Sequence, residues 1–501
     1  MWQGYVHDPA FAAGAALFAA AFATWLLWAL ARQARDPGDP ALGTGVLWLA
    51  ALVAVPSDAD RVATLVQVFP RPAFVAGLLS APEAWLWVAA GVCLIVGRRN
   101  LARLPWPALA LPLLWAACAL STYPTNFTWR ILEGVLALLA VLSSPFTAGV
   151  LEARLRWLCR AVLVASWLLW VLDESAATWV GQRGVLGFDR FLGVLHHPNY
   201  LGAVAAVALV MEASRLGRGR PAAWLWSVLA AASLVASDSV GSEVAACVGL
   251  AVLAVAPSAA AKRRGQAVWP VGPDRLAKGR AERPIPWRSP DDLVGLAGRA
   301  LADPRRMPPG GRPSTSGQAR PGLLRLHPVA VVGAALAASA ALWVLVNGSA
   351  RFLNVVTSSR SDIWAVVVQH LWDDGWAGGG VYAMGSPFIA DFLPLAAIHA
   401  HNQLLESILE SGALGLALLV AAVAALLWGA LQPGPWRRER LALVVSLLFN
   451  CVVEVPLSLP LVGSSFVVIG LTAFVLTPFE TAGEPVVRFQ TDARRRICFA
   501  G

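Results

Sequence analysis

Charged residues are scarce in this chain: Asp, Glu, Lys and Arg make up 14% of its 501 residues, whereas soluble proteins average about a quarter. Hydrophobic residues make up 57%, and the mean hydropathy is +0.63. The apolar residues fall in blocks of roughly 15 to 25, about the length that a helix needs to cross a bilayer. The scarcity of charge excludes an ordinary soluble domain. It predicts an all-α fold, a polytopic transmembrane helical bundle of about 12 to 14 spans.

Two further features are lacking. No Lys or Arg precedes the first apolar block, and a cleaved signal peptide needs a positively charged start, so residues 11–31 are expected to remain as a helix. The six cysteines have no metal-binding or redox spacing and are interpreted as small core residues. No set of metal ligands is visible, so we predict neither a metal nor a cofactor.

The apolar blocks define the expected spans. They are 11–31, 41–56, 83–97, 104–120, 130–150, 157–173, 198–213, 222–236, 240–257, 327–347, 403–431, 441–456 and 457–477. Residues 62–79 are also apolar, but Arg71 lies there between two prolines. We interpret 62–79 as an interfacial or re-entrant segment.

Basic residues orient the predicted spans. The motifs ARQAR (31–35), GRRNLAR (97–103), LEARLR (151–156), SRLGRGR (214–220) and PWRRER (435–440) fall in alternate connections. Cytoplasmic loops of membrane proteins are enriched in Lys and Arg, so we predict these connections to be cytoplasmic. The intervening connections, including 174–197 and 348–402, then face outward.

Residues 258–326 differ in composition from the rest of the chain, with fourteen Lys and Arg, five Asp and Glu, and ten prolines. Such a segment cannot bury a core, so we predict a disordered cytoplasmic linker that contacts anionic membrane lipids and not nucleic acid. The predicted organisation is therefore about nine spans in 1–257, this linker, a core at 327–477 with the outer loop 348–402, and a cytoplasmic tail at 478–501.

Two predicted helix starts on the outer face look alike. One reads His196-His197-Pro198-Asn199 and the other His399-Ala400-His401-Asn402. Proline suits the first turn of a helix, and asparagine is a good N-cap. A helix N-terminus favours an anion such as phosphate, and a histidine beside it can take up or release a proton near neutral pH. We expect His401 to lie at or before the start of its helix.

Other polar residues flank these two helix starts. Glu410 is expected about two turns inside the membrane, where an ionisable group is costly and faces the protein interior; it is either functional or a structural anchor to another helix. Arginine binds phosphate bidentately, and four arginines lie in the predicted outer loops: Arg183, Arg190, Arg351 and Arg360. Arg360 opens an amphipathic stretch (358–372) that predicts a helix on the outer surface.

The stretch SRSDIW, a glycine-rich segment and HAHNQLLESILESGALG together resemble the signature region of the O-antigen ligase and O-antigen polymerase superfamily. RFLGVLHHPNYLG (190–202) resembles that superfamily's upstream segment. The resemblance covers 358–416 and 187–203. It implies a metal-independent glycosyltransferase of the bacterial cytoplasmic membrane. Such an enzyme moves a glycan from an undecaprenyl diphosphate carrier to an acceptor glycan or lipid on the outer face.

The resemblance also implies roles for individual residues. Arg360, His401 and Glu410 are the expected catalytic residues, with His401 acting on the acceptor hydroxyl. The resemblance matches Arg190 and Asn402 by position, and they are expected to bind substrate. The two helix starts and the outer-loop arginines add Arg183, His197, Asn199 and His399 as expected substrate-binding residues. His399 duplicates the histidine two residues early, so either histidine is a candidate base. The long basic insert departs from the superfamily, as do the acidic residues of SDSVGSEV (237–244).

Two other function classes compete with a glycosyltransferase. A transporter or flippase also holds ionisable groups within the membrane, but usually near the midplane and on broken helices. A cell-wall polymerase of the rod-shape and division type is also multi-pass and depends on a lipid carrier, but its motif is not visible. The sequence does not separate a ligase from a polymerase, because both use the same donor.

Overall fold

The computed structural model describes eleven stretches of the chain: 5–54, 68, 71–121, 126–183, 189–195, 197–216, 220–256, 360–374, 378–379, 400–457 and 463–477. This part is mostly helical, with 83% of it in helices and almost no sheet. The predicted linker, the span at 327–347, most of the loop 348–402 and the tail lie outside the described residues.

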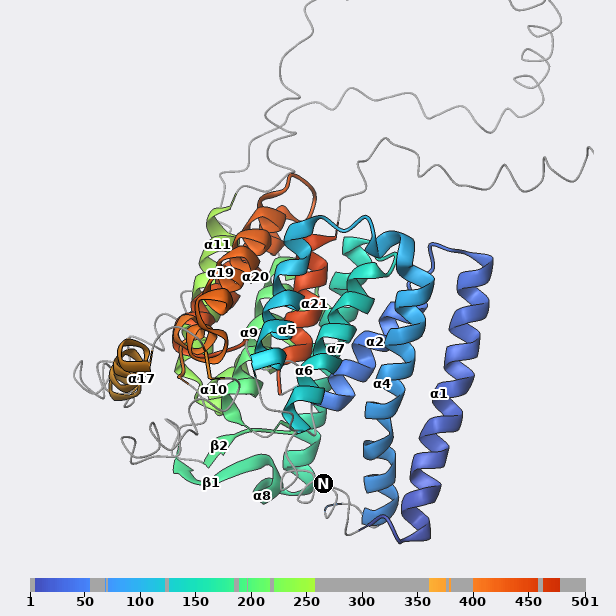
Figure 1. Cartoon of the computed structure of the whole chain (residues 1–501). Helices are drawn as coiled ribbons and strands as arrows, with labels where there is room; N and C mark the ends of the chain where they lie inside the picture. Colours follow the sequence, from blue (N-terminus) through green and yellow to red (C-terminus); the bar gives the residue numbers. More distant parts are fainter. Residues whose placement is uncertain are drawn as a thin grey trace, which may run out of the picture. The chain divides into compact units, whose positions relative to one another are not determined.

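The helices match most of the expected spans (Figure 1). They are α1 (Pro9–Arg35), α2 (Ala41–Ala54), α4 (Pro72–Leu101), the 3₁₀ helix η1 (Trp106–Leu109), α5 (Ala110–Ser121), α6 (Asn126–Ser143), α7 (Ala148–Leu172), α8 (Glu174–Ala177), α9 (Pro198–Leu216), α10 (Ala222–Ser237), α11 (Val240–Val255), α17 (Arg360–Asp374), α19 (Gln403–Leu431), α20 (Arg437–Val453) and α21 (Ser465–Leu476).

Four of the described helices, α1, α4, α7 and α19, are long and apolar enough to cross a membrane. Five shorter apolar segments accompany them: α2, η1 with α5, α10, α11 and α21. These helices indicate a membrane protein. The larger number of spans expected from the sequence stays a prediction.

Helix α21 is buried at every one of its twelve positions. It packs against α2, α6, α7, α19 and α20, so it forms the centre of the helical core. No residue of α21 is charged, which suits a helix with no face in solvent. The five neighbouring helices therefore pack around α21 as a shared apolar centre.

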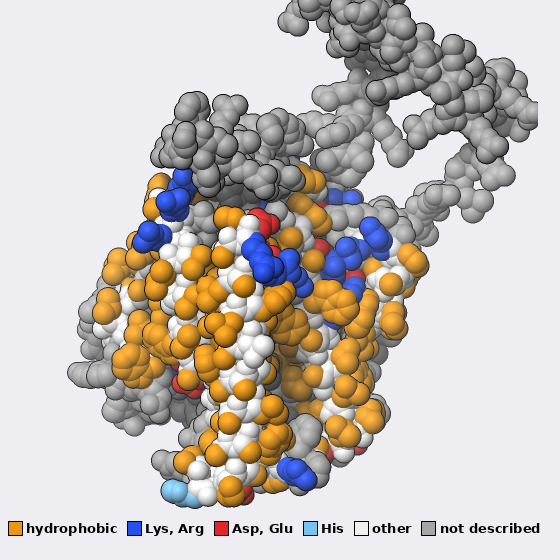
Figure 2. Space-filling view, turned by 90° about the vertical axis from the view of Figure 1, so that its right-hand side faces the viewer, with side chains coloured by type: hydrophobic (Ala, Val, Ile, Leu, Met, Phe, Trp, Pro, Cys, Tyr) orange, Lys and Arg blue, Asp and Glu red, His pale blue; other side chains and the backbone are white. Residues whose placement is uncertain are grey.

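Helices α1 and α4 run parallel, and their N-terminal halves pack closely because Gly14 and Gly77 lie against the backbone of the opposite helix. The last turn of each helix is basic, with Arg32 and Arg35 in α1 and Arg98 and Arg99 in α4. Figure 2 shows this face as mainly hydrophobic, with Lys and Arg gathered toward one end. The orientation of these helices relative to the membrane stays a prediction.

Two sequence interpretations are corrected by the helices. Residues 72–79 are not a separate interfacial segment, because α4 runs without interruption from Pro72 through the span expected at 83–97, with Pro82 inside it. The basic motif at 151–156 is not a loop. It lies within the first turns of α7, and its Glu152 and Arg156 are buried.

The buried charges of α7 pair with α9. Arg160 donates to Glu212 at 2.7–2.8 Å, and Arg156 donates to Glu152 at 2.5 Å. Because each guanidinium has a carboxylate beside it, the desolvation of these charges is partly compensated. Arg156 also lies 3.8 Å from Glu212, and Glu152 lies 3.6 Å from Arg215, so the charges that the sequence assigned to a loop join α7 to α9.

A short antiparallel hairpin departs from a purely helical fold. Strands β1 (Thr178–Arg183) and β2 (Asp189–Phe191) pair with Thr178 opposite Phe191 and Trp179 opposite Arg190. The hairpin occupies the connection 174–197 that the sequence predicts to face outward. It leads directly into α9, and it therefore positions Arg190 near the start of that helix.

Candidate functional site

A chain of hydrogen bonds joins the two motifs that the sequence analysis singled out. Asn199, in the first turn of α9, donates from Nδ2 to Glu454 Oε1 at 2.6 Å. Glu454 Oε2 lies 3.4 Å from His401 Nδ1. Arg190 donates from Nη2 to Asn199 Oδ1 at 3.0 Å. These four residues, here called the outer cluster, place Arg190, Asn199 and His401 together although 211 positions separate the first from the last.

Glu454 is not among the site residues predicted from the sequence. It caps the C-terminal end of α20, and its backbone N–H donates to the carbonyl of Asn450 at 2.8 Å. Its side chain is 12% exposed. A carboxylate in an otherwise apolar stretch was the available signal, because such a residue is costly to keep in a membrane protein. Its two oxygens bridge Asn199 and His401.

His401 lies immediately before α19, as expected, with a backbone φ of +49°. This left-handed conformation is uncommon for a residue other than glycine. The next residue, Asn402, is the N-cap of α19 and accepts hydrogen bonds from the N–H groups of Leu404 and Leu405. The turn therefore directs the His401 ring toward Glu454, and its side chain remains 23% exposed.

The start of α19 is pinned to the end of α20. Asn402 Nδ2 donates to the carbonyl of Val452 at 3.1 Å, and Leu457 N–H donates to Gln403 Oε1 at 2.7 Å. These two bonds hold His401 and Glu454 at a defined separation. Two N–H groups at this helix start are taken by the Asn402 side chain, which limits the N–H donors left for the phosphate predicted there.

Glu406 lies in the first turn of the same helix. Its Oε2 accepts a hydrogen bond from Ala400 N–H at 2.5 Å, and the residue is 2% exposed. The carboxylate thereby closes the turn that contains His401. These bonds fix the backbone at the start of α19, where Asn402 acts as the N-cap; its predicted role in substrate binding stays a prediction.

Arg190 holds the C-terminal end of α10. Its Nε donates to the carbonyl of Ser237 at 3.3 Å and its Nη2 to that of Asp238 at 3.0 Å. A cation is favourable at a helix C-terminus, where carbonyl groups lack helical partners. The same guanidinium therefore orients Asn199 and closes the corner between α10 and α11.

His197 has a structural place beside the outer cluster. Its Nδ1 accepts the backbone N–H of Asn199 at 3.2 Å, and its ring packs edge-on against Trp179 at 4.8 Å and Tyr200 at 5.7 Å between centroids. Helix α9 begins at Pro198, as predicted. The predicted substrate-binding residue His197 thus helps to start the helix that carries Asn199.

Glu410, on α19, contacts helix α5, which carries no residue of the outer cluster. Cys118 of α5 lies 3.2 Å from its Oε2, and Ser121 donates to its backbone carbonyl at 2.9 Å. The residue is 3% exposed and lies in the third turn of α19. Of the two roles left open by the sequence, these contacts fit a structural anchor between α19 and α5.

The three remaining predicted residues are only partly covered by the structure. Arg360 is the first residue of α17, and Arg183 is the last of β1, but their side chains lie outside the described residues, as does all of His399. Helix α17 is nevertheless fixed near the outer cluster. Trp364, one turn after Arg360, donates from Nε1 to the carbonyl of Ala400 at 2.9 Å.

Part of the glycine-rich segment packs against a kink in α19. Gly412 interrupts the helix with φ +63° and ψ −151°. Gly379 N–H donates to the carbonyl of Leu409 at 2.7 Å, just before that kink. Gly378 has φ +84°, and a Cβ there would lie 2.6 Å from Gly412 N. Only glycine fits this contact, so Gly378 and Gly379 are packed against α19. The rest of the glycine-rich segment, which runs from 375 to 385, lies outside the described residues.

The structure shows no group of three or more His, Cys, Asp or Glu side chains that could hold a metal ion within the part of the chain that it describes. Comparison with known protein families finds no match for this chain, and comparison with curated proteins finds none either.

Proposed function

We propose that this protein is a membrane glycosyltransferase. It moves a glycan from an undecaprenyl diphosphate carrier to a hydroxyl of an acceptor glycan or lipid at the outer face of the bacterial cytoplasmic membrane. The observation that carries the proposal is the hydrogen-bonded chain from Arg190 through Asn199 and Glu454 to His401. It unites the two stretches in which the sequence resembles the O-antigen ligase and polymerase superfamily.

His401 is the proposed general base. In the tautomer with hydrogen on Nδ1, this nitrogen donates to Glu454 Oε2, and Nε2 can then accept a proton. The carboxylate of Glu454 also stabilises the imidazolium that forms, as an oriented carboxylate does for a catalytic histidine. The separation of 3.4 Å is long for a hydrogen bond, and such bonds commonly tighten when substrate binds.

The reaction balances without a redox step. The acceptor hydroxyl gives its proton to His401 Nε2, and its oxygen forms a bond to the anomeric carbon of the donor sugar. The bond between that carbon and the phosphate oxygen breaks, and undecaprenyl diphosphate leaves with the electron pair. This single displacement inverts the configuration at the anomeric carbon, because no covalent glycosyl-enzyme forms and no second displacement follows.

The diphosphate is the part of the donor that needs positive charge. Arg360 and Arg183 are proposed to bind it, since a guanidinium remains charged and forms paired hydrogen bonds with phosphate oxygens. Arg190 is better suited to positioning, because its hydrogen bonds hold Asn199 and the C-terminal end of α10. Its substrate-binding role is therefore proposed to be indirect.

The proposed site lies at one end of the helical core, which favours a transferase over a transporter. Asn199, His401 and Glu454 stand at the helix ends that the basic connections predict to face outward. A transporter usually places such groups near the membrane midplane. We propose that the helices α1 to α21 span the membrane as a polytopic bundle with this end outside.

A transfer assay with defined components tests the proposal. The purified protein in liposomes is supplied with an undecaprenyl diphosphate oligosaccharide and a set of acceptor glycans. We expect release of undecaprenyl diphosphate that requires both the acceptor and the wild-type His401. Release that is equally fast with His401→Ala, or movement of the intact donor across the bilayer without transfer, would contradict the proposal.

A further inference from the structure

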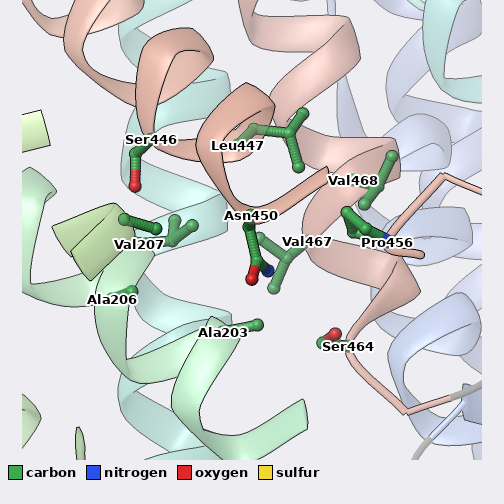
Figure 3. Close-up of a pocket in the computed structure, with 11 residues that line it drawn as sticks. Ala203, Ala206, Val207, Ser446, Leu447, Asn450, Pro456, Ser464, Val467 and Val468 are labelled. Atoms are coloured by element: carbon green, nitrogen blue, oxygen red, sulfur yellow. The ribbon is translucent and has the colours of Figure 1, made fainter. Parts of the chain in front are cut away.

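A small pocket lies between α9, α11, α20 and α21 (Figure 3). Its cavity volume is about 30 Å³. A site needs at least about 10–15 Å³ by this measure to hold one water molecule, so the pocket has room for about two. It is too small for a sugar ring or an isoprene unit.

Asn450 of α20 provides the polar group of this pocket, and Figure 3 shows its side chain in the middle of the lining residues. The residue is 6% exposed, and its Oδ1 is buried without a hydrogen-bond partner among the described residues. A buried amide oxygen that lost its water and gained no partner is unfavourable. The pocket therefore provides room for a hydrogen-bond donor next to Asn450 Oδ1.

Two serine hydroxyls lie on the same pocket. Ser446 precedes Asn450 by one turn on α20, and Ser464 comes directly before α21. The side chain of Ser464 makes no capping hydrogen bond to α21. Each hydroxyl can donate one hydrogen bond and accept two. Together with Asn450, they offer the two to four polar partners that a buried water requires.

The pocket lies about one helical turn from the outer cluster, toward the middle of α9 and α20. Asn450 lies four residues before Glu454 on α20, and Ala203, which lines the pocket, lies four residues after Asn199 on α9. Residues four apart share one face of a helix. The pocket thus begins one turn below the two residues that hold the centre of the outer cluster.

We infer that this pocket is a water-binding site, which holds about two water molecules between Asn450 Oδ1 and the hydroxyls of Ser446 and Ser464. The bound water joins α20 to the start of α21 and hydrates the inner side of the outer cluster. None of the described residues that line the pocket is charged, so water is favoured over a cation. The inference does not depend on the proposed enzymatic function.

Hydroxyl-radical footprinting of the full-length protein tests this site, because radicals form from water and modify the side chains next to it. Leu447 lines the pocket, whereas Leu443 lies one turn earlier on α20 at 1% exposure and does not line it. In the wild type we expect Leu447 to be modified several-fold faster than Leu443. In Asn450→Leu, which has no amide to bind water, the two rates should become similar.

Three outcomes would overturn the inference: equal rates at Leu447 and Leu443 in the wild type, an unchanged Leu447 rate in Asn450→Leu, or a Leu447 rate that changes when NaCl is replaced by choline chloride. The last result would indicate a bound cation. If Asn450→Leu does not fold, a high-resolution density map of the wild type decides the matter. Peaks at about 2.7–3.2 Å from Asn450 Oδ1 are expected, and an empty pocket would contradict the proposal.

Discussion

Replacement of Glu454 by glutamine is the most informative perturbation of the outer cluster. Glutamine keeps the size of glutamate but has only one acceptor oxygen. The short 2.6 Å bond from Asn199 would take that oxygen, and the new amide would then face His401 Nδ1. His401 would have to accept at Nδ1 and carry its hydrogen on Nε2. It could no longer take a proton from an acceptor hydroxyl.

The expected loss equals the contribution of the general base. General acid–base catalysis typically contributes about 10²–10⁴-fold, which corresponds to about 2.7–5.4 kcal/mol of barrier at 1.36 kcal/mol for each tenfold change. Because the bond between His401 and Glu454 measures 3.4 Å, we expect the lower part of this range, about a hundredfold lower kcat. The KM for the lipid-linked donor should change little, since Glu454 carries no positive charge for the diphosphate.

The assay is acceptor-dependent release of undecaprenyl diphosphate by purified variants in liposomes. Glu83→Gln serves as the control, because Glu83 is also a carboxylate that accepts a side-chain hydrogen bond, in its case from Arg130, but it belongs to α4 and lies outside the outer cluster. Glu454→Gln should keep the thermal unfolding midpoint near that of the wild type, as the Asn199 bond survives. A kcat for Glu454→Gln within about twofold of the wild-type value would refute the role of Glu454 in orienting the base.

Three other predictions concern separate parts of the molecule. Asn402→Ala should lower stability by about 1 kcal/mol because α19 loses its N-cap, whereas Asn402→Asp should not; equal unfolding midpoints for both variants would contradict the capping role. Glu212→Gln should destabilise the protein by about 3–5 kcal/mol because Arg160 loses its buried counter-charge. A neutral effect on the unfolding free energy would show that the pair is not coupled. Arg360→Lys should lose most transfer activity with a raised KM for the donor, because lysine cannot bind diphosphate as a fork. Unchanged kinetics would make Arg360 a solvated residue.

The helix starts could be predicted from the sequence because their chemistry is local. Pro198 and Asn402 act on backbone groups within one turn of themselves, and α9 and α19 begin next to them as expected. Helix α19 also has the predicted bounds, 403–431, since its apolar block is long and is followed by Pro433. Such features need no knowledge of how distant segments pack.

The partners of these residues could not be predicted, because they depend on tertiary packing. Glu454 follows His401 by 53 residues, and nothing local to either residue indicates their contact. The same holds for Arg190, whose length and charge suggested a phosphate ligand but which instead reaches the carbonyls at the end of α10. The position of an arginine in the sequence shows where a positive charge is available. It does not show which group binds that arginine in the folded protein.

Buried charges also misled the reading of the helix boundaries. The motif around Glu152 and Arg156 was assigned to a cytoplasmic connection because such connections are enriched in Lys and Arg. Charges are costly inside a membrane protein. The cost is offset where each charge finds an opposite one on α7 or α9, and that pairing appears only in three dimensions. Helix α4 shows the opposite error. The prolines on either side of Arg71 suggested a separate segment at 62–79, but α4 begins at Pro72 and continues to Leu101.

Extraction of lipid-linked glycans from the native host tests the central claim most directly. Cells with wild-type protein are compared with cells in which His401→Ala replaces it at the same membrane abundance. The account predicts that the variant accumulates undecaprenyl-linked glycans, with long chains on the carrier indicating a ligase and single repeats indicating a polymerase. An unchanged pool of carrier-linked glycans, together with an altered flux of another solute, would contradict the account and favour a transporter.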